Sequence, residues 1–265
     1  MEKKKVYGIA VAVIVVAAIV LVILNGASNS QAALIAFDNQ PVNTTQLSIM
    51  ESIASNMTLA NRVGSGYMTT YPQSISGQNV TVVDGKPAVI YVGADFCPFC
   101  AIARWGLIIA LMRFGTFSRL NYMTSSSSSK EPFRTVPTFT FYNSSYSSTL
   151  ISFVSAEIET NTYQPLQSLN ALQNAAVGAY DTSSSIPFID FGNQSAQVGV
   201  PQSVSPGYLK NLNWGQIIAL MGQSNSTVSQ ALIGQANVFT AQICRMDGFK
   251  PTSVCSQPFV KKILS

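Results

Sequence analysis

Residues 88–100 read AVIYVGADFCPFC, an apolar run that passes through a short turn into a Cys-x-x-Cys motif. Residues 88–92 have the length and continuous hydrophobicity of a strand that is covered on both faces of its sheet. Asp84-Gly85 precedes them and predicts a tight turn from a first strand at residues 80–83. Apolar side chains at helical spacing follow in residues 101–114. The stretch therefore predicts a buried strand, a turn and a helix that begins at the two cysteines.

This arrangement is typical of a dithiol redox site. The unpaired amide groups and the positive dipole end of a helix start stabilise a thiolate at Cys97. Pro98 suits the first helical position, where its missing N–H costs nothing. Cys100 returns within one turn, close enough to form a disulfide with Cys97. We therefore expect Cys97 to be the nucleophile, with its sulfur accessible to solvent, and Cys100 to be the resolving cysteine. Asp95, Phe96 and Arg104 are expected nearby.

Residues 93–100 resemble the active-site turn of the thioredoxin superfamily, and the Pro-Phe dipeptide is most similar to glutaredoxins. The whole chain also resembles an uncharacterised family of membrane-anchored archaeal thioredoxin-like proteins. The resemblance, which covers residues 80–222, implies a cis-proline beside the dithiol at the start of a later strand. Pro187 is the main candidate because a hairpin and a helix near Leu212 follow it, and Pro137 is its rival.

The same resemblance implies a thiol–disulfide oxidoreductase that acts on cysteines of exported proteins. It implies no organic cofactor, since the sulfur atoms carry the electrons. A membrane disulfide-generating oxidase would re-oxidise the pair. The alternative is a non-catalytic thioredoxin-like binding or structural module at the cell surface, whose disulfides only stabilise it.

The rest of the chain predicts one elaborated α/β domain over residues 44–265: a thioredoxin-like fold with an inserted hairpin and extra helices. Residues 125–129 are a serine tract, expected to be a solvated loop. A strand is expected at 120–123, followed by the inserted hairpin with strands at 138–142 and 150–154 on either side of a serine-rich turn at 143–148. A further strand is expected at 186–191, with a hairpin partner at 197–200. Helices are expected at 44–63, capped by Thr44 or Thr45, and at 165–180, 214–221 and 228–243.

Residues 1–28 predict a cytoplasmic head and a signal-anchor helix. Residues 6–24 are an uninterrupted uncharged run, long enough to cross a bilayer once, behind Lys3, Lys4 and Lys5. Lysines stay in the cytoplasm, so the remainder is expected outside the cell membrane, with residues 29–43 as a tether. A cleaved signal peptide is the alternative, and it also exports the domain.

Cys244 and Cys255 lie near the chain end, where a structural disulfide is expected in an oxidising compartment. A relay to Cys97–Cys100 and a four-thiolate zinc site are the alternatives. Asparagines in Asn-x-Ser/Thr triplets are candidate glycosylation sites. They are Asn43, Asn56, Asn79, Asn143, Asn193 and Asn225.

The composition excludes several functions. The chain has no histidine, which rules out imidazole bases and Ser-His-Asp triads. Its net charge of +4 falls to +2 without residues 2–5, so no nucleic-acid partner is expected. Only 10% of residues are charged, which suits a surface in acid medium or one coated with glycans. Glu157 and Glu159 alone do not predict a glycosidase. Trp105 and Trp214 are expected in the core.

Overall fold

The computed structural model describes residues 29–265 and has β3 (Lys86–Gly93) in the middle of a mixed sheet. Strand β6 (Ser152–Glu157) pairs with β3 in parallel, and β7 (Phe188–Phe191) pairs with it antiparallel. Strands β8 (Ser195–Val198) and β1 (Gln73–Ser74) extend the sheet antiparallel beyond β7. The short β2 (Val82–Val83) pairs with the start of β3, as the Asp84-Gly85 turn predicts. The protein is thus a mixed α/β domain.

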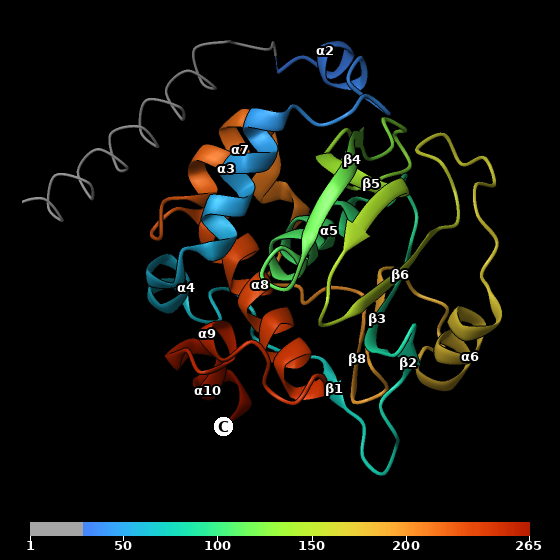
Figure 1. Cartoon of the computed structure of the whole chain (residues 1–265). Coiled ribbons are helices and arrows are strands. Elements are labelled where there is room, and N and C mark those ends of the chain that lie inside the picture. The colour runs from blue at the N-terminus through green and yellow to red at the C-terminus, as the bar shows by residue number, and fades with distance from the viewer. Residues whose placement is uncertain (1–28) are drawn as a thin grey trace, which may run out of the picture.

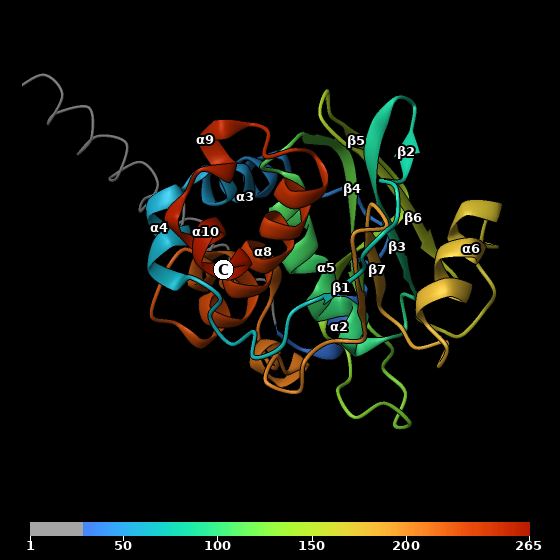
Figure 2. The ribbon, with the colours of Figure 1, turned by 90° about the horizontal axis from the view of Figure 1, so that it is seen from below.

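Side chains of β3 alternate between two apolar layers, which is why the strand is buried from Ala88 to Gly93. Val89 and Tyr91 belong to the larger core, and Ile90 and Val92 belong to a smaller cluster. The larger core is built mainly with helices α5 (Pro98–Leu111) and α8 (Thr227–Met246). Helix α6 (Ala171–Tyr180) covers the opposite face with the smaller cluster. Figure 1 and Figure 2 show the sheet between α6 and the larger group of helices.

Helices α5 and α8 pack closely against each other. A Cβ added at Gly106 of α5 would lie 2.8 Å from the Gln235 Oε1 of α8, so a larger residue would push the helices apart. Helix α7 (Trp214–Met221) has the predicted bounds. The predicted helix at 44–63 is two helices, α3 (Thr44–Ser55) and α4 (Met57–Val63), because Asn56 leaves the helical conformation and caps α4. Asn43, and neither threonine, caps α3.

The inserted hairpin differs from the prediction. Strand β4 (Thr116–Thr124) pairs with β5 (Pro137–Ser147) in a separate two-stranded sheet, so residues 120–123 do not join the main sheet. The parallel partner of β3 is instead the predicted strand at 150–154, now β6. Irregular register in the β4–β5 pair and a positive φ of 56° at Asn143 let β5 continue through the serine-rich stretch expected as a turn.

Both tryptophans pack in the core, as predicted, and each links its helix to the start of β5 by a hydrogen bond. The indole N–H of Trp105 donates to Pro137 O at 2.9 Å, and that of Trp214 donates to Thr138 O at 2.6 Å. Four shorter elements complete the part of the chain from residue 29 to residue 265. They are α2 (Gln31–Ile35), the 3-10 helix η1 (Pro206–Leu209), α9 (Thr252–Cys255) and α10 (Pro258–Leu264).

Residues 29–43, expected as a tether, pack against the domain. Val42 N–H donates to Leu120 O of β4, and the Asp38 carboxylate accepts from the Thr124 N–H at 2.7 Å. Leu34 and Val42 are buried, which explains the docking. The predicted head and signal-anchor at 1–28 lie outside the described residues. Within residues 29–265, no helix is both long enough and apolar enough to span a bilayer.

Candidate redox site

The two cysteines of the motif lie at the start of α5, where the chain leaves the buried end of β3. Cys97 is the N-cap residue and Pro98 opens the helix. The Cys97 Sγ accepts a hydrogen bond from the Cys100 N–H at 3.1 Å, so one of the unpaired amides of the helix start points at the sulfur. Neither cysteine is in a disulfide. The described state is therefore the dithiol.

The two sulfurs differ in their acidity. Hydrogen bonding from the Cys100 thiol lowers the pKa of Cys97, assisted by the backbone amides of Cys100 and Phe99 and by the positive charge of Arg104, against the effect of burial. Burial raises the pKa of Cys100 well above its ordinary value, and the neighbouring Cys97 raises it further. A thiolate therefore forms at Cys97 before Cys100, which is the order that the expected nucleophilic role of Cys97 requires.

The proline that opens β7 lies beside the dithiol. The Ile186–Pro187 peptide bond is cis, as expected for Pro187, and the Ile186 carbonyl oxygen lies 3.9 Å from Cys97 Sγ. Its rival, Pro137, is not preceded by a cis bond and instead opens β5. Of the peptide bonds between residues 29 and 265, Lys250–Pro251 is also cis. The carbonyl group before Pro187 thus faces the Cys97 sulfur.

A buried charge cluster lies beneath the motif. The Arg104 guanidinium donates to both carboxylate oxygens of Glu157, at 2.9 and 2.6 Å, and to the Ala94 carbonyl at 2.7 Å. Asp95 Oδ1 lies 3.4 Å from Arg104 Nη2. Burial, and then the Glu157 charge, raises the pKa of Asp95 to about 7 against the effect of Arg104. One cation thus faces two carboxyl groups, and Asp95 exchanges its proton near neutrality.

Glu157 is the residue of this site that the sequence pattern did not identify. In the sequence, the alternation of Glu157 with Glu159 does not by itself predict a role for either carboxylate. The available signal was Arg104, a lone cation in a helix whose other side chains are apolar. A fully buried guanidinium requires an ionic partner, so a carboxylate from another element was to be expected.

Solvent reaches the first sulfur less than the sequence predicts. Cys97 exposes 5% of its surface and Cys100 none. Phe99 between them is 37% exposed and packs edge-on against Phe133, with ring centroids 6.0 Å apart. The Cys97 sulfur therefore lies just below an apolar surface.

The serine tract forms part of this surface. Ser126 N–H donates to the Phe96 carbonyl at 3.0 Å, and the Phe96 ring packs on Tyr163 with centroids 4.7 Å apart. Ser125 and Ser126 are buried, so the expectation of a fully solvated loop is wrong for these two residues. The Ser126 amide supports the turn that carries the dithiol, whereas the Ser125 amide donates to the Val136 carbonyl of the adjacent chain segment. Ser127 and Ser129 are exposed.

The second cysteine pair forms a disulfide, as the sequence predicts, between the end of α8 and α9. Because Cys244 and Cys255 are bonded to each other, they are not ligands in the four-thiolate zinc site considered as an alternative. Between residues 29 and 265, no group of three or more acidic, cysteine or histidine side chains is placed to hold a metal ion.

Five of the six candidate glycosylation asparagines are exposed: Asn43, Asn56, Asn79, Asn143 and Asn225. Asn193 is half-buried, and its Nδ2, the atom to which a glycan is attached, donates to the Asn79 carbonyl at 3.1 Å. Its Oδ1 accepts from the Tyr180 hydroxyl. A glycan at Asn193 would break this interaction, so this site is the least suited of the six.

Comparison with known proteins gives one match. Residues 71–179 match a family described as a domain of unknown function, DUF929. No curated protein and no solved structure matches the chain. The match includes β3, both motif cysteines, the β4–β5 hairpin and Glu157, and it ends before Pro187. The dithiol and its buried charge cluster therefore fall within the part of the chain that is similar to this family.

Proposed function

We propose that this protein is a thiol–disulfide oxidoreductase of thioredoxin-like fold, anchored in the cell membrane with its domain outside the cytoplasm. The observation that carries the proposal is the division of roles at the helix start: Cys97 has a lowered pKa and accepts the Cys100 amide, whereas Cys100 is fully buried with a raised pKa. A metal site or a purely structural disulfide has no need for this asymmetry.

The element order supports the proposed fold. Strand β3 leads into the dithiol at the start of α5, and the parallel strand β6 and helix α6 follow. Pro187 then precedes the antiparallel pair β7–β8. The resemblance to thioredoxin-like proteins implies this order, with the β4–β5 hairpin as an addition. It also implies that the terminal helix is the one near Leu212, which is α7, whereas the helix that packs against both α5 and β7 is α8.

The exchange reaction balances within the two cysteines and a client. The Cys97 thiolate attacks one sulfur of a client disulfide, the client S–S bond breaks, and the second client sulfur leaves as a thiolate. Cys100 then loses its proton and attacks Cys97 Sγ, which releases the first client sulfur. The client gains two electrons and the Cys97–Cys100 disulfide forms; the reverse sequence oxidises a client dithiol.

Trapping of a mixed disulfide tests this proposal. A Cys100→Ser variant removes the resolving sulfur, so Cys97 should stay covalently bound to exported proteins of the native host. The matched control is Cys97→Ser, which keeps one cysteine in the motif but leaves only the buried one. We expect adducts that reductant releases in the first variant and none in the second. Equal adduct levels in both, or none in either, would contradict the proposal.

The second candidate function is a non-catalytic cell-surface module, and the 5% exposure of Cys97 is the observation in its favour. In that case the motif cysteines would form a disulfide that only braces the start of α5. The absence of adducts in the trapping experiment is the result that this alternative predicts.

A further inference from the structure

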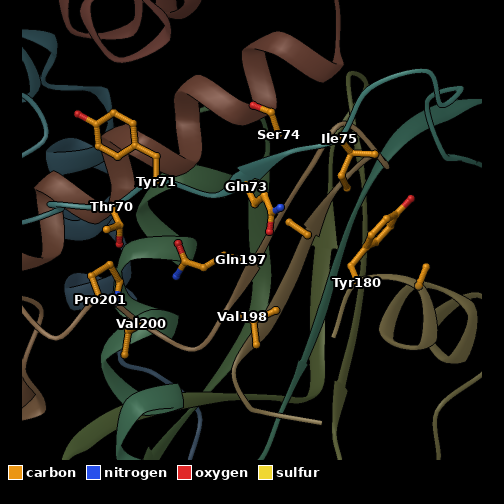
Figure 3. Close-up of a pocket in the computed structure, with 12 residues that line it drawn as sticks. Thr70, Tyr71, Gln73, Ser74, Ile75, Tyr180, Gln197, Val198, Val200 and Pro201 are labelled. Atoms are coloured by element: carbon orange, nitrogen blue, oxygen red, sulfur yellow. The ribbon is translucent and has the colours of Figure 1, made fainter. Parts of the chain in front are cut away.

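A cavity of about 550 Å³ lies at the β1–β8 edge of the sheet, and the proposed chemistry does not use it. It lies between the residues just before β1, the end of β8 and the end of α6, and Figure 3 shows the side chains around it. Its volume is in the range of small-ligand sites. The residues that line it are uncharged, so a charged ligand would find no ion-pair partner among them.

Gln197 is the polar group of this cavity that lacks a partner. The residue is 6% exposed, and its Nε2 donates to the Gly199 carbonyl at 2.9 Å. Its Oε1 is buried and accepts no hydrogen bond from the protein. Because a buried acceptor without a donor is costly, this atom calls for a donor from outside the chain.

The sheet edge at the cavity is open. Strand β1 pairs with β8 only at Gln73–Ala196 and Ser74–Ser195. In an antiparallel strand every second residue directs its N–H and C=O outward. Strand β8 has β1 on its outer side and β7 on its inner side. The Gln194 carbonyl accepts from the Ile75 N–H on the outer side, and the Gly199 N–H donates to the Pro187 carbonyl on the inner side. By alternation, the backbone groups of Ala196 and Val198 face outward. Val198 lies beyond the end of β1, and its backbone therefore faces no strand.

Two apolar side chains are exposed at the same place. Tyr71 is 44% exposed and Val198 is 41% exposed, although both types are usually covered. The cavity is joined to the redox site through the backbone, because the Gly199 N–H donates to Pro187 O at 2.7 Å and Ile186 O faces Cys97. Two backbone contacts therefore lie between Gly199, next to the cavity, and the Cys97 sulfur.

We propose that this cavity binds an extended, uncharged segment of polypeptide. The backbone of the segment pairs with Val198 as an added strand, one of its N–H groups donates to Gln197 Oε1, and an apolar side chain lies between Tyr71 and Val198. That the segment flanks the reacting cysteine of a client rests on the proposed function; the binding itself does not.

Binding of a cysteine-free peptide to the full-length protein tests this inference. The probe is a fluorescent, end-capped decapeptide of Gly, Ala, Val and Ser, measured by anisotropy, beside a version with two aspartates. Val198→Lys and Gln197→Leu each alter the cavity. The matched control is Val82→Lys, an exposed valine at the opposite edge of the sheet.

We expect the neutral peptide to bind at least tenfold more weakly to Val198→Lys and Gln197→Leu than to the wild type or to Val82→Lys, and the aspartate version to bind weakly throughout. Equal binding to Val198→Lys and Val82→Lys, or no binding to the wild type at millimolar peptide, would overturn the inference. The probe lacks sulfur, so the two proposals can fail separately. Peptide binding without trapped adducts would support the peptide site and contradict the redox function. Trapped adducts without peptide binding would support the redox function and contradict the peptide site.

Discussion

At the residue scale, Cys97 and Cys100 are three positions apart but have different environments. Cys97 accepts a hydrogen bond from a helix-start amide, whereas Cys100 is fully buried. The sequence predicts that Cys97 is the more acidic of the two, because a helix start stabilises an anion whatever the rest of the fold is. It did not predict the limited exposure of Cys97, because the residues that cover the site come from distant parts of the chain. Phe133 and Tyr163 are examples, since each contacts an aromatic residue of the motif. The pairing of Arg104 with Glu157 escaped prediction for the same reason.

The acidity difference gives a pH dependence for alkylation. The lowered pKa of Cys97 means that its reaction with iodoacetamide in the reduced protein should be half-maximal at a lower pH than the ~8.5 of a free cysteine. Cys100 should remain unmodified over the same range, because burial holds its thiol protonated. Mass spectrometry of the labelled peptides measures both rates. Faster labelling of Cys100, or a Cys97 midpoint above that of free cysteine, would reverse the assigned roles.

At the element scale, the strands and helices were predicted well where the local pattern is strong. The β2–β3 turn, α5, α7 and the β7–β8 pair follow from turn residues and from apolar spacing within a few residues. The strand pairing of the inserted hairpin was predicted wrongly, because residues 120–123 and 150–154 look equally suitable as neighbours of β3. Which of them pairs with β3 depends on packing with α5 and β5, which no short window of sequence contains.

Removal of the Cys244–Cys255 disulfide tests the role of the chain end. Its loop spans a sequence separation of 11, so the Cys244→Ala/Cys255→Ala variant should lose about 2–3 kcal/mol of unfolding free energy, measured by urea denaturation under non-reducing conditions. The trapped adducts of Cys97 should be unchanged, because the disulfide only braces α8 and α9. A loss of adducts with little loss of stability would indicate the relay role instead.

At the scale of the whole molecule, several carboxyl groups are buried in a chain that has few charges. Burial raises the pKa of Asp38, Asp190 and Asp247 to about 6 and that of Asp95 to about 7. The ordinary value is 3.8. Between these limits the folded protein binds more protons than the unfolded chain. The low charge of the composition thus accompanies carboxyl groups whose burial, full at Asp95 and Asp190 and partial at Asp38 and Asp247, favours their protonated form.

The stability of the protein should therefore rise on acidification. The contribution of these groups is fully present below about pH 4 and is lost as the pH rises through about 6 to 7. We expect a higher urea midpoint at pH 4.5 than at pH 7.5. Asp190→Asn should reduce the difference between the two midpoints, because asparagine does not titrate. The amide oxygen of the variant still accepts the Asn193 N–H, so the local hydrogen bond is kept. Asp84→Asn, in the exposed β2–β3 turn, is the control; a higher midpoint at pH 7.5 would contradict the expectation.

Redox titration of the Cys97–Cys100 couple in the full-length protein tests the central claim most directly. Equilibration with glutathione buffers, followed by thiol labelling of the two cysteines, gives the reduction potential. A couple that exchanges electrons with clients should fall within the ~ −120 to −270 mV of known exchange catalysts. A potential below about −300 mV would mean a structural disulfide and would contradict the assignment of this protein as an oxidoreductase.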